Sequence, residues 1–447
     1  MTVHASESST IVSVTCISRD EPTSHFLCAK EFEVIQLLFT VTTARRALAP
    51  LFGCLIALAP LSAQSVDSLS AYRRAKAPTA TKTDGWSADV ESKAAVQYDD
   101  NVFLLSPSQR TAVASPSAGS ITSGRYEGME SANDVIGVTN LGVRLSGPGA
   151  GGHTLEITPE VTYEFASRNQ SRREAAGALS IAQSLGGGRR VRLSAGSTPS
   201  HFARNYLSDA VDADANGSIS SNERIYMRGQ YGEYSIGGDL RMPFGVKSSK
   251  GAGVVLGAGA GYYARSYDAP FALRDLSGPT AAVSLAIGQK SPVGLELSYD
   301  LASLSASRGR QVVLLDEPVY NVDFNGNGRT TDLNARALVD VDRSRLEHQL
   351  GAALNFDTGR RAAASIGYDY RIRSFRSTLP YDEADAGRRD NRSGVRGSLR
   401  AKMAKGAYMS AGVKFLSQRT NRPLGSVLGE EDDYRNLVAS VGLQAKF

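Results

Sequence analysis

Oxygen-bearing side chains recur at regular intervals in one short stretch of the sequence, DADANGSISSNE at residues 212–223. They occupy positions 1, 3, 5, 7, 9 and 12 of the stretch and are Asp212, Asp214, Asn216, Ser218, Ser220 and Glu223. Ca²⁺ takes about six to eight oxygen ligands, and a loop of this length can supply them at this spacing if a glycine permits a sharp turn at position 6. Gly217 stands at that position. The spacing therefore predicts a calcium-binding loop.

This loop resembles the calcium loop of EF-hand proteins in its ligands but not in its surroundings. An EF-hand loop joins two helices, whereas the residues after Glu223, RIYMRGQYGEYSIGGDL, are rich in glycine and aromatic residues and predict a strand. Without a pair of helices the ion cannot drive the opening motion of a calcium sensor. We therefore expect Ca²⁺ to brace a loop between two strands. The alternative is a solvated polar loop that binds no ion.

A second stretch, DFNGNGRTTDLN at residues 323–334, resembles the start of dockerin-type and EF-hand calcium loops. Its candidate ligands are Asp323, Asn325, Asn327 and Asp332. Gly328 again stands at position 6, but position 12 is Asn334, and the last carboxylate falls two residues before it. The bidentate carboxylate that normally closes such a site is therefore displaced, and we predict a weaker calcium site here.

The segments that must position these loops alternate strictly between apolar and polar residues. In TLEITPEVTYEF, residues 154–165, one parity holds Leu155, Ile157, Val161, Tyr163 and Phe165, and the other holds Glu156, Glu160 and Glu164. Because successive side chains of a strand point to opposite faces, this segment has one apolar face and one polar face. The same alternation recurs to the end of the chain, so we predict an all-β protein.

Short turns and long polar loops alternate between these predicted strands. The six short turns lie near 147–152, 186–190, 245–251, 289–292, 357–361 and 404–407. The seven long loops lie near 99–133, 167–173, 205–224, 267–279, 308–343, 376–391 and 419–433. An even strand number, with short turns at one end and long loops at the other, is typical of bacterial outer-membrane barrels. We therefore predict an antiparallel transmembrane β-barrel of about 14 strands, with short periplasmic turns and long external loops.

The alternative for the same alternation is a soluble β-sandwich, whose apolar face would form a core. Two local resemblances favour the barrel. The last segment, YRNLVASVGLQAKF, ends in Phe447 and resembles the terminal β-signal of outer-membrane proteins, which implies insertion by the barrel-assembly machinery. The stretch VQYDDNVFLL, residues 96–105, lies at the end of the first predicted strand. It resembles a motif of outer-membrane porins and of barrels associated with exopolysaccharide.

The N-terminal region predicts export. Arg45 and Arg46 precede an apolar run that ends at small residues, as in a secretory signal peptide cut after Ala63. We assign residues 1–42 to an upstream extension or mis-start, 43–63 to the signal peptide, 64–85 to a periplasmic linker, and 86–447 to the barrel. The expected location is therefore the cell outer membrane of a Gram-negative-type envelope.

Composition narrows the class of protein further. All three cysteines precede residue 64, which suits an envelope protein that needs no disulfide. The net charge of +5 is small for 447 residues and gives no case for nucleic-acid binding. No G-x-S-x-G, H-E-x-x-H, P-loop or C-x-x-C pattern occurs. We expect no enzymatic activity, since His153, His201 and His348 have no evident catalytic partner; an outer-membrane hydrolase is the weakest alternative.

The function expected from these features is that of a porin or a solute or polysaccharide channel with a calcium-binding external loop. Its polar parity would line the lumen, with charges of both signs: Glu156, Glu160, Glu164, Arg190 and Arg192. Its expected partners are outer-membrane lipid and small solutes or polysaccharide. The alternative is a surface structural or adhesion barrel that has calcium-braced loops and no channel activity.

Overall fold

The computed structural model describes residues 85–115, 124–207, 226–244, 253–288, 291–314, 336–357, 361–379, 382, 385–421 and 433–447. All of them belong to the second of the two units into which the chain divides, residues 60–447. No helix among these residues is both long and apolar enough to cross a membrane.

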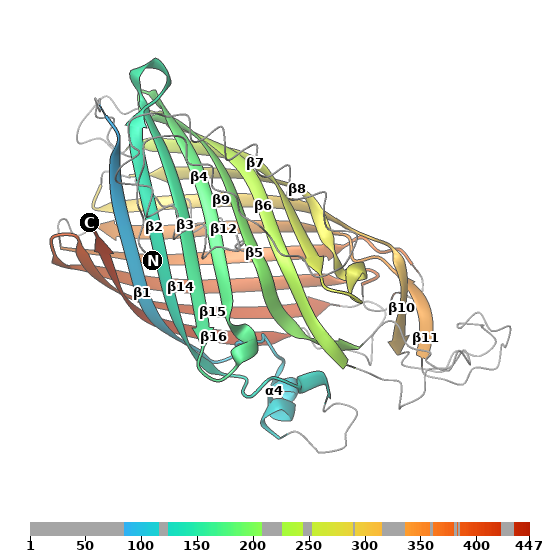
Figure 1. Cartoon of the computed structure of the whole chain (residues 1–447). Helices are drawn as coiled ribbons and strands as arrows, with labels where there is room; N and C mark the ends of the chain where they lie inside the picture. The colour runs from blue at the N-terminus through green and yellow to red at the C-terminus, as the bar shows by residue number, and fades with distance from the viewer. Residues whose placement is uncertain are drawn as a thin grey trace, which may run out of the picture. The chain divides into compact units, whose positions relative to one another are not determined.

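Within the described residues, fourteen antiparallel strands close into one barrel (Figure 1). In chain order they are β1 (Ser87–Asp99), β2 (Asp134–Pro148), β3 (Thr154–Ala166), β4 (Glu174–Gly186), β5 (Arg189–Leu207), β6 (Tyr226–Phe244), β7 (Val254–Tyr267), β8 (Leu276–Ile287), β9 (Val293–Ala306), β12 (Arg345–Asp357), β13 (Ala362–Phe375), β14 (Arg389–Ala404), β15 (Ala407–Asn421) and β16 (Tyr434–Lys446). Each pairs with its neighbours in this order, and β9 pairs directly with β12. The predicted fold is confirmed, and the sandwich alternative is wrong.

The first and last strands close the barrel. Strands β1 and β16 pair from Glu91 opposite Lys446 to Asp99 opposite Val438. Beyond this ladder, the Phe447 amide donates to the Val90 carbonyl at 2.9 Å, and the Val90 amide donates to the Phe447 carbonyl at 3.2 Å. Closure leaves no strand edge with unpaired backbone groups, which is the condition for a sheet that crosses a bilayer.

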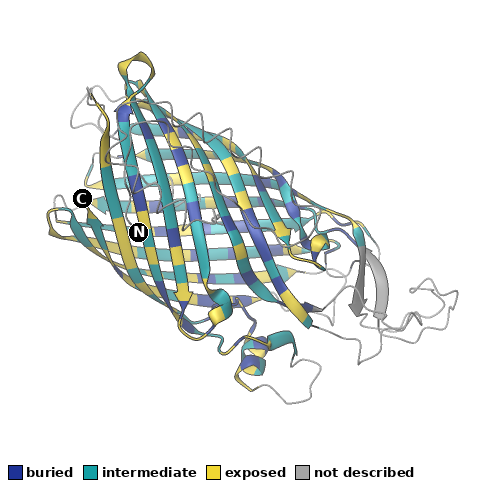
Figure 2. Cartoon of the chain, in the orientation of Figure 1, coloured by how far each residue is buried: buried dark blue, intermediate teal, exposed yellow. Residues whose placement is uncertain are grey.

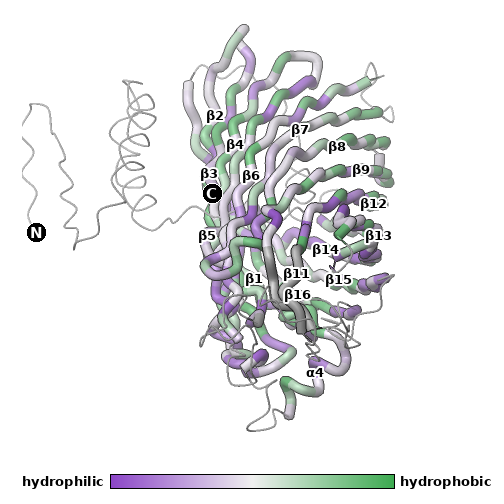
Figure 3. The backbone as a smooth tube through the Cα atoms, turned by 90° about the vertical axis from the view of Figure 1, so that its right-hand side faces the viewer, coloured by the Kyte–Doolittle hydropathy of each residue, from purple (hydrophilic) through white to green (hydrophobic). Residues whose placement is uncertain are grey.

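The outside of the barrel is apolar and the inside is polar. Outward side chains such as Val96, Ile236 and Leu443 are 59%, 64% and 63% exposed. The alternation of exposure and of hydropathy along the strands is visible in Figures 2 and 3. This is the inverse of a soluble sandwich and the arrangement expected of a barrel in lipid.

The antiparallel strand order puts the strand ends that flank the six predicted short turns at one end of the barrel, and those that flank the seven predicted long loops at the other. The turn between β4 and β5 shows why these turns are rich in glycine. Gly186, Gly187 and Gly188 have φ angles of 78°, 59° and 78°, a region that residues with a side chain rarely adopt. The sequence therefore predicted correctly both the number of strands and the grouping of short turns at one end of the barrel and long loops at the other.

Two long loops contain elements that the sequence analysis did not predict. The loop between β9 and β12 forms a hairpin of β10 (Gly309–Leu314) and β11 (Arg336–Val341). The loop between β1 and β2 contains helix α4 (Pro107–Ala114) and a 3-10 turn, η1 (Gly124–Tyr126). Further three-residue 3-10 turns are η2 (Ala150–Gly152), η3 (Gln170–Arg172) and η5 (Ala272–Arg274). Figure 1 shows α4 at the end of the barrel opposite the β2–β3 turn.

The stretch VQYDDNVFLL does not belong wholly to the first strand. Strand β1 ends at Asp99, and the buried Asn101 turns the chain inward: its side chain accepts a hydrogen bond from the Leu105 amide at 2.8 Å and donates one to the Leu105 carbonyl at 2.7 Å. The apolar side chains that follow then pack inside the loop end of the barrel. This cluster comprises Val102, Phe103, Leu105, Val113, Met129, Ile136, Ala166 and Phe202.

Candidate functional site

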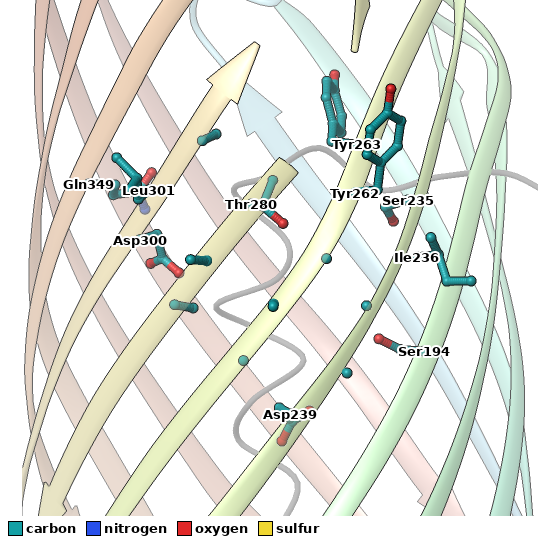
Figure 4. Close-up of a pocket in the computed structure, with 18 of the residues that line it drawn as sticks. Ser194, Ser235, Ile236, Asp239, Tyr262, Tyr263, Thr280, Asp300, Leu301 and Gln349 are labelled. Atoms are coloured by element: carbon teal, nitrogen blue, oxygen red, sulfur yellow. The ribbon is translucent and has the colours of Figure 1, made fainter. Parts of the chain in front are cut away.

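The candidate functional site is a recess in the lumen wall, formed mainly by β6 to β9 (Figure 4). Its floor consists of small residues on adjacent strands, which are Gly237, Gly259, Gly261, Ala282 and Ala302. A Cβ atom at position 261 would lie 2.6 Å from the carbonyl oxygen of Ile236, so the close approach of β6 and β7 requires glycine there. The recess exists because this part of the wall carries almost no side chains.

Polar side chains surround the floor of the recess. Figure 4 shows the hydroxyl groups of Thr280 and Ser194 and the side chains of Asp239, Asp300 and Gln349 around it. Asp239 accepts a hydrogen bond from Nε of Arg192 at 2.6 Å, so this carboxylate is fixed in place. A concave surface with a few fixed donors and acceptors is the usual form of a site for a small polar molecule.

One side of the recess is built by an ionic network around Glu347 on β12. Its carboxylate accepts a hydrogen bond from Nε of Arg345 at 2.6 Å and another from Nε of Arg373 at 3.1 Å. Nη1 of Arg371 forms a longer ion pair with it at 3.8 Å. Glu347 is only 5% exposed, so a buried carboxylate contacts three guanidinium groups.

A second network fixes Tyr263, which also lines the recess. The Tyr263 hydroxyl donates to Oε1 of Glu233 at 2.6 Å, and Nη2 of Arg265 donates to the same oxygen at 2.5 Å. The guanidinium of Arg265 lies 4.4 Å from the ring centre of Tyr231, which is cation–π distance. Strands β6 and β7 therefore hold the phenol of Tyr263 rigidly.

The lumen charges that the sequence predicted lie on the inward parity and are partly paired. Nη2 of Arg190 donates to Glu156 at 2.6 Å, and Glu160 accepts from the Asn140 side chain, also at 2.6 Å. Arg192 forms the pair with Asp239 described above. Glu164 shares this parity near the loop end of β3.

Charges of opposite sign face each other across the lumen. Acids gather on β3 and β4, whose inward carboxylates are Glu156, Glu160, Glu164 and Glu174. Cations outnumber acids on β12 to β14: the inward parity holds Arg345, Arg371, Arg373, Arg392, Arg396, Arg400 and Lys402 against Glu347, Asp357, Asp369 and Asp390. In the closed order of fourteen strands, β3 and β12 are seven positions apart and therefore lie on opposite walls. This arrangement sets up an electric field across the lumen.

His153, His201 and His348 occupy separate places and do not form one site. His201 lies inside the loop end of the barrel, with Nε2 at 2.7 Å from Nη1 of Arg172 and Nδ1 at 2.5 Å from Glu174. His348 lies on the outward parity of β12, with Nδ1 at 2.8 Å from the hydroxyl of Tyr299. His153 lies at the β2–β3 turn beside Gly186. The cluster around His201 depends on strand register, so sequence reasoning missed it.

Buried aspartates tie the external loops between β9 and β14 together. Asp382 accepts hydrogen bonds from the Asp342 amide at 3.0 Å and from the Ser377 hydroxyl at 2.5 Å. Burial and the neighbouring carboxylate of Asp385 raise the pKa of Asp382 to about 6. Burial also disfavours the charge of Asp342, but hydrogen bonds from Ser344 and Arg308 outweigh it and lower the pKa of this carboxyl.

The predicted calcium ligands lie outside the described residues. Asp212, Asp214, Asn216, Ser218, Ser220 and Glu223 fall within 208–225, and Asp323, Asn325, Asn327 and Asp332 fall within 315–335. In the part of the chain that the structure describes, no group of three or more histidine, cysteine or acidic residues is arranged to hold a metal ion. Both calcium sites therefore stay predictions.

Comparison with known proteins finds likeness in solved structures alone, because no family model and no curated protein matches the sequence. The toluene transporter TodX of Pseudomonas putida is 9% identical, with 86% of this chain and 95% of that one covered and a TM-score of 0.34. OprD of Pseudomonas aeruginosa is 11% identical, with 83% and 100% covered and a TM-score of 0.33.

A loop-deletion variant of OmpT, an outer membrane protein of Vibrio cholerae, is 8% identical, with 81% and 100% covered and a TM-score of 0.36. At these identities and scores the likeness adds nothing to the barrel that the strand order already establishes. The chain thus resembles outer-membrane barrels of solved structure, and its function has to be argued from its own lumen.

Proposed function

We propose that the protein is an outer-membrane channel of a Gram-negative-type envelope that passes small polar solutes or polysaccharide segments. The observation that carries the proposal is the recess, because it combines a floor of glycines and alanines with fixed polar groups inside a barrel whose outside is apolar. A barrel that served only as a structural scaffold would have no need of such a surface in its lumen. No catalytic step is part of this proposal.

The opposed walls suit transport of polar molecules. A molecule with a dipole, or with charges of both signs, would orient between the acids of β3 and β4 and the cations of β12 to β14. Selectivity in pores arises from pore diameter, from lining donors and acceptors, and from electrostatic barriers. The recess supplies lining donors and acceptors, and the opposed charges supply an electrostatic barrier.

Filling the recess should lower the ion current. The full chain in planar bilayers is expected to give steady single-channel currents, and Ala282→Trp should reduce their conductance severalfold because a large rigid indole would stand on the recess floor. The matched control is Ala281→Trp, one residue earlier on β8, which places the same indole on the outward face and should leave the conductance unchanged.

The two variants separate the alternatives. Equal conductance in both would show that the recess lies off the path. If a correctly folded wild-type barrel carried no current, the channel proposal would be wrong, and the surface structural or adhesion barrel would take its place.

On the sequence alone, we further propose that Ca²⁺ is the cofactor of the external loop at 212–223, with a weaker site at 323–334. Glu223→Gln removes the charge that would close the first site bidentately. Limited proteolysis of this variant should cut faster beside Arg224 while the barrel stays assembled, and chelation of the wild-type protein should act in the same way. Glu127→Gln, in another external loop, is the control. Identical cleavage with and without Ca²⁺ would show that the stretch binds no ion.

A further inference from the structure

We propose that the outward face of β14 to β16, at the loop end of these strands, binds the phosphate groups of an outer-leaflet glycolipid. The inference rests on the membrane location in the proposed function but not on channel activity. It starts from three arginines, Arg389, Arg419 and Arg435, which lie on the outward parity of three neighbouring strands and are all exposed.

The register places these arginines side by side. Arg435 pairs across the ladder with Ser417, which stands two residues before Arg419 on the same face. Arg419 pairs with Asn391, which stands two residues after Arg389. Each arginine is therefore the diagonal neighbour of the next, at about 7–8 Å between backbone positions. Long side chains at this spacing can converge on one phosphate or on two adjacent ones.

None of these three guanidinium groups has a hydrogen bond or ion pair with the described residues, in contrast to the arginines of the lumen. Among the described residues, two acids stand at neighbouring positions, and both accept hydrogen bonds from backbone amides. Asp433 accepts from the Thr420 amide at 2.5 Å, while Asp100 accepts from the Leu437 amide at 2.6 Å and pairs with Arg110 at 3.8 Å. The patch thus presents positive charge outward.

The apolar surface of the barrel begins directly beside the patch. Phe415 and Leu437 are partners across the ladder, and Val395 is the partner of Phe415; the three are 43%, 39% and 50% exposed. Each of them lies two residues along its own strand, or roughly 7 Å, from a residue of the patch: Val395 from Ser393, Phe415 from Ser417 and Leu437 from Arg435. The arginines therefore lie where the acyl chains of a lipid end and its headgroup begins.

The chemistry of this boundary selects the ligand. Guanidinium groups bind phosphate bidentately, and positive side chains at a membrane surface attract anionic headgroups. The small polar side chains between the arginines, Ser393, Ser417 and Asn391, leave room for a headgroup and can hydrogen-bond to it. A glycolipid that carries phosphate on its sugar and has acyl chains below fits both parts of the surface.

The test measures binding of diphosphoryl lipid A to the purified full chain in detergent micelles by native mass spectrometry. Arg389→Ala, Arg419→Ala and Arg435→Ala together should weaken binding about a hundredfold, given the typical contribution of each cation at a membrane surface. The matched control replaces Arg189, Arg361 and Lys405 with Ala, because these cations are exposed at the short-turn end of the barrel. It should bind lipid A like the wild type.

Two further arms identify the source of the phosphate. Lipid A without phosphates should bind as weakly as the triple variant, and millimolar inorganic phosphate should not displace the intact lipid. Wild-type affinity in the triple variant, equal loss in the control, or displacement by free phosphate would each overturn the proposal. The triple variant should keep its single-channel current, so loss of lipid binding with the current intact separates this inference from the channel proposal.

Discussion

Glu347→Gln is expected to lower the free energy of unfolding of the barrel by roughly 3–5 kcal/mol, the usual cost of removing one partner from a buried ion pair. Gln keeps the shape of the side chain but removes its charge. Arg345 and Arg373 now donate to the carboxylate at 2.6 and 3.1 Å, so the buried Arg345 and the half-buried Arg373 would both lose this counter-charge. Urea titration of the folded barrel in detergent, followed by circular dichroism, measures the change.

Glu160→Gln provides the matched control. This glutamate is also inward and partly buried, but its oxygen accepts from the neutral Asn140 side chain rather than from a guanidinium. The control should therefore cost much less than the loss of Glu347. Adding Arg373→Gln to the Glu347 variant should restore part of the stability, because one of the unpaired cations disappears. Equal losses in both single variants would show that solvent in the lumen screens the network.

The strand pattern could be predicted because a barrel in lipid imposes it on every strand. Leu155, Ile157 and Val161 face outward on β3 because lipid solvates that side, and Glu156 and Glu160 face inward for the opposite reason. The alternation of turn and loop lengths then gave the strand number. These regularities are local, so one sequence contains them.

The recess could not be predicted from any single segment. The recess depends on small residues of different strands lying at the same level along the barrel axis. The strand pairing places Gly259 beside Ala282, and Ala282 beside Asp300. One of the three arginines around Glu347 follows from sequence, because Arg345 stands two residues away on the same face. Arg371 and Arg373 join it only through the register of β12 and β13.

Helix α4 and the β10–β11 hairpin escaped prediction for a different reason. Neither one crosses the bilayer, so the alternation that identifies a barrel strand does not apply to them. The helix begins with a capping box, in which the Ser106 hydroxyl accepts from the Gln109 amide and the Gln109 side chain accepts from the Ser106 amide. The Ser and Gln of this capping box can be recognised in the sequence, but the segment lies in a stretch that we predicted to be a long loop between two strands.

Val441→Arg should have the second large effect, a loss of roughly 2–4 kcal/mol if the residue lies near the bilayer midplane. Val441 is central in β16, is 58% exposed, and pairs with the outward Val96 of β1 at the closing seam. A guanidinium there would have to leave water for hydrocarbon. The seam forms when the last strand meets the first, so assembly should suffer together with stability.

The fraction of barrel that keeps its compact mobility in unheated gel samples measures this assembly, and urea titration measures the free energy. Ser440→Arg is the control, because the adjacent residue of the same strand faces the lumen and pairs with the polar Gln97. The same added charge should be tolerated there, since water and polar side chains can solvate it. If both variants assembled normally, β16 would not present Val441 to lipid. If both failed alike, the strand would tolerate no added charge on either face, and the assignment of its two faces would be wrong.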